Sequence, residues 1–570
     1  MFKTVKELEG KSKKSLTVIK DSNGAKHFQL EKVLDLWKEH FENHLNTEFP
    51  HDEDALNSLA NESNEIEFLN ELISIEEVNS AVKKMKKRKA PGSDKITTEV
   101  IKSGGAKMIE MLHKIFNLIW TSEKTPADFS RMIVSPIHKK GDRLKRDNYR
   151  AISLLSIPGK VFLHILMNRM KDKVERKLKE SQYGFRPGRG TVDAIFIIRQ
   201  IIEKAREKKI PLNFHFIDFK AAFDTIWRKA LWQMVNKIGV NPKITRIVQY
   251  MYNNTQCAVI IDNNLTEWFT VEVGVRQGCI LSPMFFNIFL EFVMDEISSL
   301  RELHLNENLS ANIRYADDTT FISVIFDKLK IATQELETAC RKWGLKINGT
   351  KCKIISSELD EEIDIDDEAI EKVENFVFLG SVVPNSTDDI VRRIALASTA
   401  FGRLKNTVWN RRDLSNKIKV RLYNALIVPI AIYASETWTL KAEDERKLTV
   451  FENDCLRNMV GRNRIDRCKM KDIRRQLGVT HLITDVVTRR RLTWFGHVIR
   501  RGDASYVYRT YKEEFPGKRP QGRPPKRWVD DIRLQTKIPL LTLERKALNR
   551  NKWKAYVDKE CAKIPGGLCI

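Results

Sequence analysis

Two adjacent acids, Asp317 and Asp318, lie in the stretch IRYADDTTFIS. Strand-like residues flank the pair, with Ile313 and Tyr315 before it and Phe321 and Ile322 after it, so the pair is expected at the tip of a β-hairpin. Like charges held side by side are costly unless a cation lies between them. Carboxylate oxygens are the ligands that Mg²⁺ prefers. An isolated Asp-Asp pair is weak evidence, because most such pairs are solvated turns.

A third acid, Asp218, lies upstream in NFHFIDFKAAFD. The run before it is strand-like, and the run after it, KAAFDTIWRKALWQMV, is helix-like. Asp218 is therefore expected at the C-terminal end of a strand, where α/β proteins collect their chemistry. One acid after a strand and two on a neighbouring hairpin would hold two divalent ions about 4 Å apart. Such a site supports in-line phosphoryl transfer, the reaction of polymerases.

Eight sequence blocks in a fixed order resemble the reverse transcriptase of non-LTR (LINE-type) retrotransposons, of the RTE-like kind. The resemblance is strong over residues 85–390 and looser elsewhere. The blocks are KAPGSDKITTEVIKSGG (89–105), SPIHKKGDRLKRDNYRAISLL (135–155), SQYGFRPGRGTVDAI (181–195), FIDFKAAFD (216–224), GVRQGCILSPMFFNIFLE (274–291), YADD (315–318), GLKINGTKCKI (344–354) and FVFLGS (376–381).

The resemblance implies an α+β fold of the right-hand polymerase type, with fingers, palm and thumb. Helical N-terminal and basic C-terminal extensions are expected to flank it. The expected division is a helical or linker region (1–80), fingers and palm (81–390), a helical thumb (391–454) and a basic nucleic-acid-binding region (455–570).

The implied activity is RNA-directed DNA polymerisation, with deoxynucleotide triphosphates added to a DNA or RNA primer on an RNA template. In the family the primer is a nicked chromosomal 3′ end. The residues before position 15 are too few for a nuclease domain, so the endonuclease is expected to be supplied elsewhere.

The resemblance also assigns the metal ligands. Asp218 and Asp317 are implied to hold two Mg²⁺ ions, with Mn²⁺ as the alternative, while Asp318 tunes the site. The backbone carbonyl of Phe219 is expected to complete one coordination sphere. Asp224 is expected to cap or pair within the following helix rather than to bind metal.

A triphosphate needs cationic partners, and Arg offers a planar fork where Lys offers a point charge. Arg150, in DNYRAISLL, is implied to lie over the phosphates. Lys139 and Lys140 are further candidates, with a basic turn as the alternative. The family usually has Pro after this Arg, whereas this chain has Ala151.

Phe223 is implied to press on the sugar of the incoming nucleotide and to exclude a 2′-hydroxyl; core packing on an amphipathic helix is the alternative. Gln277 and Gly278 are expected near the nucleotide sugar or the template. Lys351 is either the proton donor to the leaving pyrophosphate or a surface lysine.

Phe378, Leu379 and Gly380 resemble a primer grip, with a buried hairpin as the alternative reading. In the tail, a set of basic residues is expected to bind phosphate backbone without sequence preference. The aromatic residues among them, Trp494, Phe495 and Trp528, either stack on bases or form a helical core. The basic set is Arg489, Arg490, Arg491, Arg523, Lys526 and Arg527.

The formal net charge is +24, and it is concentrated at one end. Residues 391–570 hold 41 Lys and Arg against 18 Asp and Glu, whereas residues 1–390 hold 58 against 57. A basic region of this kind indicates a polyanionic partner, with a solvated charged surface as the alternative. The run 83–89 (KKMKKRK) is either a nuclear-import patch or the basic lip of the fingers, which we favour.

The eight cysteines form no CxxC pair, which fits reduced thiols and predicts no zinc site. No run of 18 apolar residues is present, so no membrane partner is expected. The expected location is intracellular, in the nucleus, with assembly in the cytoplasm as an additional stage.

Shorter segments carry their own predictions. A hairpin is expected around 22–24, a helix over 30–46 and an acidic loop over 51–66. The acidic run 359–372 is expected to be a solvated loop or insertion.

Two other classes of protein stay open. One is a nucleic-acid-binding protein with an inactive polymerase fold, which the presence of all three acids disfavours. The other is a maturase or a telomerase-like nucleotidyl transferase. The run LTWFGHVIRRGD fits retroelement polymerases better.

Overall fold

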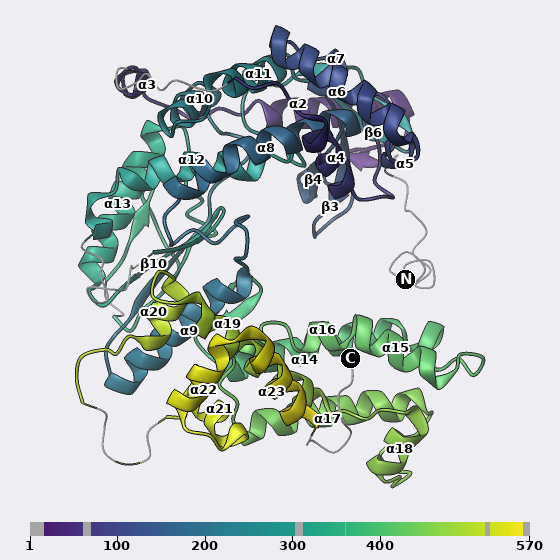
Figure 1. The fold of residues 1–570 in the computed structure, drawn as a ribbon, viewed down its shortest axis with the longest axis vertical. Helices are drawn as coiled ribbons and strands as arrows, with labels where there is room; N and C mark the ends of the chain where they lie inside the picture. Colours follow the sequence, from purple (N-terminus) through teal and green to yellow (C-terminus); the bar gives the residue numbers. More distant parts are fainter. Residues whose placement is uncertain are drawn as a thin grey trace.

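The computed structural model describes residues 16, 18–60, 70–301, 312–358, 361–518, 522 and 525–562. In the described residues, two larger sheets, three two-stranded hairpins and a set of helices make up the first part of the chain, and helices alone make up the part after residue 386. In Figure 1 the chain forms an arc, with helices at both ends and the sheet that contains β10 between them.

A four-stranded antiparallel sheet has the order β11-β5-β10-β9. Phe214 and Phe216 on β5 belong to one hydrophobic core, whereas Ile217 belongs to another. Both faces of the sheet are therefore buried, one next to α13 and the other next to α9. The strands are β5 (Asn213–Ile217), β9 (Asn312–Tyr315), β10 (Asp318–Ser323) and β11 (Lys353–Ile355), and the two helices are α13 (Phe326–Lys342) and α9 (Thr191–Lys208).

A second sheet has the order β4-β3-β6-β7, with β3 and β6 parallel and β8 paired to β6. Its strands are β3 (Arg131–His138), β4 (Tyr149–Leu155), β6 (Gln256–Ile261), β7 (Asn264–Leu265) and β8 (Phe269–Thr270). The remaining helices of the first part are α2 (Leu30–Leu45), α3 (Glu53–Ala60), α4 (Ile75–Lys84), α5 (Thr98–Ser103), α6 (Gly105–Ser122), α7 (Ala127–Ser130), α8 (Ile157–Lys177), α10 (Arg228–Lys237), α11 (Pro242–Asn253) and α12 (Ser282–Asp295).

The helices after residue 386 form two cores. The core of α14 to α18 also takes in Ile483 and Val487 at the start of α19, while the rest of α19 and α20 to α23 share a core with α9 and with β5. These helices are α14 (Ser386–Arg403), α15 (Asn416–Leu426), α16 (Val428–Ala431), α17 (Ala442–Met459), α18 (Met470–Leu477), α19 (Ile483–Arg501), α20 (Tyr506–Lys512), α21 (Trp528–Thr536), α22 (Leu540–Leu548) and α23 (Arg550–Ala562).

Three of the short-segment predictions can be compared with the structure. The hairpin around residue 23 is confirmed as β1 (Ile19–Lys20) paired with β2 (Lys26–His27), and the helix over 30–46 is confirmed as α2. The acidic loop over 51–66 is wrong for residues 53–60, which form α3. Its acids lie in the first turn, where the helix dipole favours negative charge. Residues 61–69 lie outside the described part.

The acidic run 359–372 is not an open loop but contains a hairpin, β12 (Asp364–Ile365) with β13 (Glu368–Ala369). Its two turn residues, Asp366 and Asp367, both have positive φ, as a type I′ turn requires. Ile363, Ile365 and Ile370 are buried under it. A prediction from acidity alone missed these alternating isoleucines.

The three expected domain boundaries, at 80/81, 390/391 and 454/455, fall inside α4, α14 and α17. A continuous helix is a single structural element, so these three positions do not coincide with breaks between helices, and the division into domains stays a prediction. Natural breaks in the described residues precede α14, at the hairpin β14 (Phe376–Phe378) and β15 (Ser381–Val383), and follow α18.

Two further findings concern the described residues only. Their seven cysteines are all unpaired, as predicted for reduced thiols. None of the helices in the described part is both long and apolar enough to cross a membrane.

Candidate active site

The predicted hairpin around the acid pair is confirmed. Tyr315 pairs with Asp318, so the connection between β9 and β10 is a two-residue turn of Ala316 and Asp317. On the other side of β10, Thr319 pairs with Ile217 at the end of β5. Asp218 follows Ile217 directly, and the register therefore brings all three acids to one end of the sheet, as the sequence predicted.

The three carboxylates are close enough to repel one another. Burial, and then the charge of Asp218, raise the pKa of Asp317, while Arg150 acts in the opposite direction. Burial and the charges of Asp317 and Asp218 raise the pKa of Asp318 to about 6. A site that concentrates negative charge in this way attracts cations.

Asp218 already has protein partners. Its Oδ2 accepts hydrogen bonds from Asn348 Nδ2 at 3.1 Å and from Lys351 Nζ at 3.3 Å. Within the described ranges, no group of three or more His, Cys, Asp or Glu side chains is gathered closely enough to hold a metal ion. Mg²⁺ in polymerase sites is bound by one or two carboxylates together with substrate phosphates, so the carboxylates here fit such an ion without forming a closed cage.

Cationic side chains from three segments face the acids. Lys139 follows β3 and Arg150 lies on β4, in strands that pair with each other. Burial, then the charges of Arg150 and Lys351, lower the pKa of Lys139, whereas Asp224 acts to raise it. These cations therefore share one region of space with the acids. Lys140 is exposed beside them.

The run after Asp218 is not a helix at first, contrary to the prediction. Ala221 has a φ of +46°, and α10 begins only at Arg228. The backbone of this run bonds to distant loops instead: Lys220 N donates to Lys346 O at 2.8 Å. The half-buried Phe223 thus lies on a turn rather than on an amphipathic helix.

Phe223 and Asp224 are fixed by neighbours from other elements. The ring of Phe223 stacks on Phe286 of α12, with centroids 4.4 Å apart and planes at 20°. Asp224 accepts two hydrogen bonds from Gln277 Nε2, at 2.9 and 2.7 Å. His44 Nε2 of α2 lies 3.5 Å from the same carboxylate. Asp224 therefore pairs, as predicted, but with a glutamine and a histidine outside its own segment.

The glycines of the GVRQGC block allow close backbone approach. A Cβ on Gly278 would lie 2.9 Å from Ser153 O, and one on Gly274 would lie 2.3 Å from Asp224 O. Both glycines also have positive φ, of +105° and +70°. Only glycine meets both conditions without strain, so this loop holds Gln277 against β4, where Ser153 N donates to Gln277 O at 2.9 Å.

Comparison with known families decides what this site belongs to. The family model described as "Reverse transcriptase (RNA-dependent DNA polymerase)" matches residues 137–383, a range that includes all three acids. Residues 137–383 are similar to a reverse transcriptase domain. The predicted resemblance to reverse transcriptases of non-LTR retrotransposons is confirmed, whereas the RTE-like kind stays a prediction. The reverse transcriptase family generally depends on divalent metal ions.

Curated relatives of the chain come from mobile elements. The probable RNA-directed DNA polymerase from transposon BS of Drosophila melanogaster is 25% identical over 444 residues, which are 73% of this chain and 48% of that protein. The RNA-directed DNA polymerase from mobile element jockey of Drosophila funebris is 26% identical over 423 residues, or 70% and 46% of the two chains. The chain thus spans about half the length of these relatives.

A solved structure of apo telomerase from Candida tropicalis, truncated from the C-terminal domain, overlaps partially with the chain. It covers 48% of this chain and 58% of that chain, with 17% identity and a TM-score of 0.36.

The predicted primer-grip residues lie on a tight hairpin at the edge of the reverse transcriptase domain. Leu379 and Gly380, both with positive φ, form the turn between β14 and β15. Phe378 is buried beside Phe216, with ring centroids 5.9 Å apart. Tyr433 Oη donates to Leu379 O at 2.9 Å. The hairpin is buried at one side, as the alternative reading expected, and it joins the domain to the helices that follow.

The basic residues predicted to bind phosphate in the tail have protein partners instead. Arg489 pairs with Asp558 at 2.5 Å, and Arg490 lies 3.6 Å from Glu436. Arg523 lies outside the described residues. The helices that carry these side chains pack against each other, which uses their charges within the fold.

The remaining members of that set are held more firmly. Arg491 is fully buried and pairs with Asp531 at 2.9 Å. Lys526 also pairs with Asp531, and Arg527 pairs with Glu207 of α9. The charged groups of these three residues are already paired within the fold, and the expected binding of nucleic acid by this set stays a prediction.

The aromatic residues of the tail form a core rather than a base-stacking surface. Trp528 and Phe495 are buried, and Trp494 packs against them. Trp528 meets Phe196 of α9 edge to face, with ring centroids 4.9 Å apart. The helical-core alternative is therefore the correct one, and it attaches the tail to the reverse transcriptase domain.

Two residues near the acids were missed at the level of sequence. Asn348, in the block KINGTK, donates through its backbone N and through Nδ2 to the O and Oδ2 of Asp218. An Asn before Gly is a turn signal, and that signal could have drawn attention to it. His44 carried no such signal, because a single histidine on an amphipathic helix far from the acids in sequence does not indicate its partner.

Proposed function

We propose that this chain is an RNA-directed DNA polymerase of a non-LTR retrotransposon, which extends a DNA or RNA primer on an RNA template. The observation that supports it is the meeting of Asp218, Asp317 and Asp318 at one end of the sheet, inside a reverse transcriptase domain and opposite three cations. Deoxynucleotide triphosphates, template RNA and primer or target DNA would be its substrates and partners.

We assign Asp218, Asp317 and Asp318, with the carbonyl of Phe219, to hold a pair of Mg²⁺ ions. Bound there, the ions would lower the pKa of the primer 3′-hydroxyl and would neutralise charge on the triphosphate. Lys351 is poised 3.3 Å from Asp218. We assign the Lys351 ammonium group to protonate the leaving pyrophosphate once a cation, rather than this lysine, neutralises Asp218.

Arg150 and Lys139 are assigned to the triphosphate. Burial and neighbouring cations lower the pKa of Lys139, which means that its charged form lacks sufficient compensation within the protein. A polyanionic substrate would supply that compensation. Lys140 lies exposed at the same turn and is assigned to the outer phosphates.

In this proposal the four-stranded sheet is the palm, and β3 and β4 with their helices are the fingers. Helices α14 to α17 are the thumb, which begins at Ser386 rather than at residue 391. Phe378, Leu379 and Gly380 lie between palm and thumb, where a primer grip belongs.

Phe223→Ala is expected to weaken the exclusion of ribonucleotides. Phe223 is half-buried and rigidly stacked on Phe286, so its ring would resist displacement by a 2′-hydroxyl. The ratio of kcat/KM for deoxynucleotides to that for ribonucleotides should fall by about 10-fold or more. Single-nucleotide incorporation with each nucleotide type measures it. An unchanged ratio would show that another residue excludes ribonucleotides. Phe285→Ala, one position from the stacking partner, is the control and should leave the ratio unchanged.

A second set of cations is more exposed than the tail residues named above and is assigned to the template, although three of its members, Arg411, Arg464 and Arg475, also form surface ion pairs. We call it the basic tip: it spans the segment 411–421, with α15, and the segment 462–475, with α18. The two are joined by a hydrogen bond from Asn416 Nδ2 to Gln476 O at 3.2 Å. Figure 1 shows α15 and α18 at the end of the helical part that lies away from α9. Its exposed members are Arg411, Arg412, Lys417, Arg421, Arg462, Arg464, Arg467, Lys469, Lys471 and Arg475.

Replacing Arg467 and Lys471 together by Ala is expected to weaken template binding and to reduce its salt dependence. Each lost phosphate contact should lower the slope of log K against log [salt] by about 0.7 for single-stranded RNA. Titration of labelled RNA at several salt concentrations measures it. Lys107→Ala with Lys114→Ala, two exposed lysines on α6, is the control that should leave the slope unchanged. An equal slope in both double variants would place the RNA contact elsewhere.

The test of the proposed function is primer extension by the purified full chain with Mg²⁺. A DNA primer on a homopolymer RNA template should be extended with deoxynucleotides, and a matching DNA template serves as the comparison. The absence of extension on either template, by a folded chain, would contradict the proposal. Extension on the DNA template alone would make the chain a polymerase of another class.

A further inference from the structure

The segment Ser181–Arg186 (SQYGFR) lies against the catalytic hairpin, although none of its residues belongs to the site described above. Tyr183 N donates to Arg314 O at 2.7 Å, and Arg314 N donates to Ser181 O at 2.8 Å. These bonds form a parallel bridge between Gln182 and Arg314. The segment therefore continues the palm sheet beyond β9, its outermost strand.

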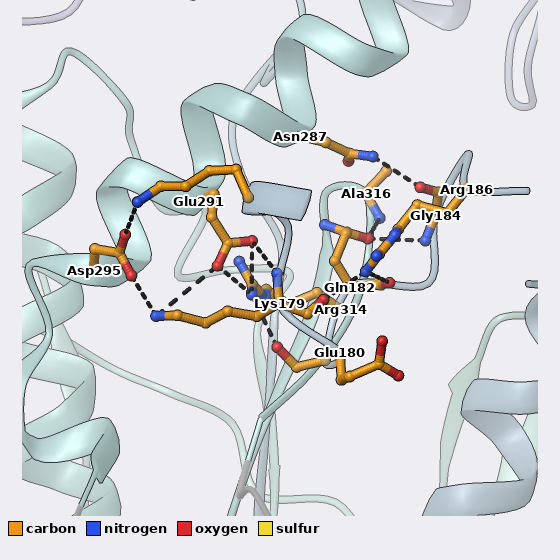
Figure 2. A network of polar contacts seen from close by, with 12 residues as sticks. Lys179, Glu180, Gln182, Gly184, Arg186, Asn287, Glu291, Asp295, Arg314 and Ala316 are labelled. Atoms are coloured by element: carbon orange, nitrogen blue, oxygen red, sulfur yellow. Dashed lines mark hydrogen bonds and ion pairs between the residues drawn. The ribbon is translucent and has the colours of Figure 1, made fainter. Parts of the chain in front are cut away.

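The side chain of Gln182 reaches the turn that carries Asp317. Its Oε1 accepts hydrogen bonds from Ala316 N at 2.9 Å and from Gly184 N at 2.8 Å, as Figure 2 shows. Ala316 has a φ of +59°. A residue with a Cβ rarely adopts this conformation, and it persists only where surrounding contacts impose it. Gln182 supplies one such contact from a fully buried position.

Gly184 makes the second contact with the turn. A Cβ at this position would lie 2.3 Å from Ala316 N and 2.8 Å from the carbonyl carbon of Tyr315. The φ of Gly184 is not positive, so the glycine is needed for close approach rather than for its conformation. Asn287 Nδ2 of α12 donates to Gly184 O at 2.8 Å and fixes it from the opposite side.

A buried charge pair anchors the segment behind the turn. Arg314 and Glu291 are both almost fully buried and lie 3.2 Å apart. Arg314 also donates to Ser181 Oγ at 2.9 Å, and Lys179 lies 3.9 Å from Glu291. Figure 2 shows this network extending from α12 through β9 to the segment. The contacts of Gln182 and Gly184 are therefore made by a rigid support and not by a free loop.

The orientation of the Gln182 amide follows from its two hydrogen-bond donors. Both groups beside Oε1 are N–H donors, so Oε1 must face them, and Nε2 is then buried without a hydrogen-bond partner among the described residues. Burying an unpaired donor costs free energy. The two hydrogen bonds that Oε1 accepts offset this cost, and one of them comes from Ala316 N in the turn of the acid pair.

We propose that Gln182 and Gly184 are positioning residues that hold the Ala316–Asp317 turn, and with it the Asp317 carboxylate, in the geometry for nucleotide transfer. The inference rests on the proposed function, because it assigns a role in that reaction. Gln182 and Gly184 touch neither the nucleotide nor the acids' oxygens. They act only through the backbone of the turn.

Gln182→Met tests the proposal, since Met keeps the length of the side chain and removes the acceptor. A displacement of Asp317 on the order of 1 Å should lower kcat for single-nucleotide addition by about 100-fold. KM for the nucleotide should stay within about threefold, because the groups assigned to the triphosphate are untouched. Gln182→Glu, which keeps an acceptor at the same distance, should recover most of kcat. Gln200→Met, at an equally buried glutamine of α9 that donates to Glu203, is the matched control and should leave kcat unchanged.

Hydrogen exchange of the Ala316 amide gives a readout that does not need activity. In Gln182→Met this amide loses its acceptor, so it should exchange at least about 10-fold faster than in the wild type, and Gln182→Glu should restore the slow rate. Unchanged exchange or unchanged kcat in Gln182→Met would overturn the inference. A fall in KM and kcat together with a general loss of protection would show a merely structural role and would also overturn it. If the wild-type chain failed to extend primers while the Ala316 amide still exchanged faster in Gln182→Met than in the wild type, only the proposed function would be contradicted.

Discussion

Asp317→Asn is expected to lower the rate of primer extension on the order of 10⁴-fold, or about 5.4 kcal/mol of activation free energy, in a chain that stays folded. Asn has the same shape as Asp but a neutral and weaker metal ligand. The acid lies in the two-residue turn at the end of the palm sheet, so the substitution changes charge without changing register. Single-turnover extension with Mg²⁺ measures the loss.

The same variant should be at least as stable as the wild type at neutral pH. Burial and Asp218 raise the pKa of Asp317, which means that ionising this carboxyl costs more in the folded chain than in the unfolded one. The resulting destabilisation is absent below the ordinary pKa near 4 and is complete above the raised pKa. Asn removes it, so the gain in the free energy of unfolding should appear as pH rises and vanish in acid.

Denaturant unfolding at several pH values, without divalent ions, tests the stability part. Asp327→Asn, at an exposed acid on α13, is the control for both measurements and should change neither. If Asp317→Asn extended primers at the wild-type rate, the assignment of the acids would be wrong. A lower stability at neutral pH would contradict the account of the charges.

The catalytic hairpin could be predicted from the sequence because its signals are local. Strand-like residues lie on both sides of the acid pair, Ile313 and Tyr315 before it and Phe321 and Ile322 after it, so both strands and the turn between them are indicated by neighbours in the chain. The same holds for α2 and for the hairpin β1–β2, each of which is set by residues close together in the chain. Asp218 followed from a strand run that ends immediately before it.

The turn after Asp218 could not be predicted in this way. Its residues favour a helix, but Val275 N donates to Phe223 O at 2.7 Å and Gly274 N donates to Ile226 O at 2.9 Å. The backbone groups that a helix would pair internally are thus used by a loop far along the chain. Tertiary contacts override the local preference here, and they also place Phe223 beside Phe286.

The partners of the basic residues in the tail could not be predicted, for a related reason. A sequence shows how many Arg and Lys a segment holds, but not which acids meet them in the fold. Arg527 finds Glu207, which is more than 300 residues away in the chain. Exposed cations gather at the basic tip, in segments whose own residues include no aromatic side chain to mark them as a nucleic-acid contact.

Arg491→Ala is therefore expected to weaken the fold rather than the binding of RNA. The Arg491 guanidinium is fully buried, pairs with Asp531 and donates to Trp528 O at 3.0 Å. Removing one partner of a buried pair costs about 3–5 kcal/mol, because the other charge is left uncompensated. Asp531 keeps Lys526 and the backbone N of Leu440 as partners, so the loss should lie near the lower end of that range.

Denaturant unfolding measures this loss, and RNA titration at several salt concentrations provides the contrast. Arg491→Ala should lower the free energy of unfolding and leave the salt slope unchanged. The double variant of Arg467 and Lys471 should instead reduce the salt slope and leave the free energy of unfolding unchanged. Adding Asp531→Asn to Arg491→Ala should recover part of the stability, because it removes the charge left behind. A reduced salt slope with unchanged stability in Arg491→Ala would show that this side chain leaves its buried pair to reach the phosphate backbone, and the tail would then regain the role first predicted for it.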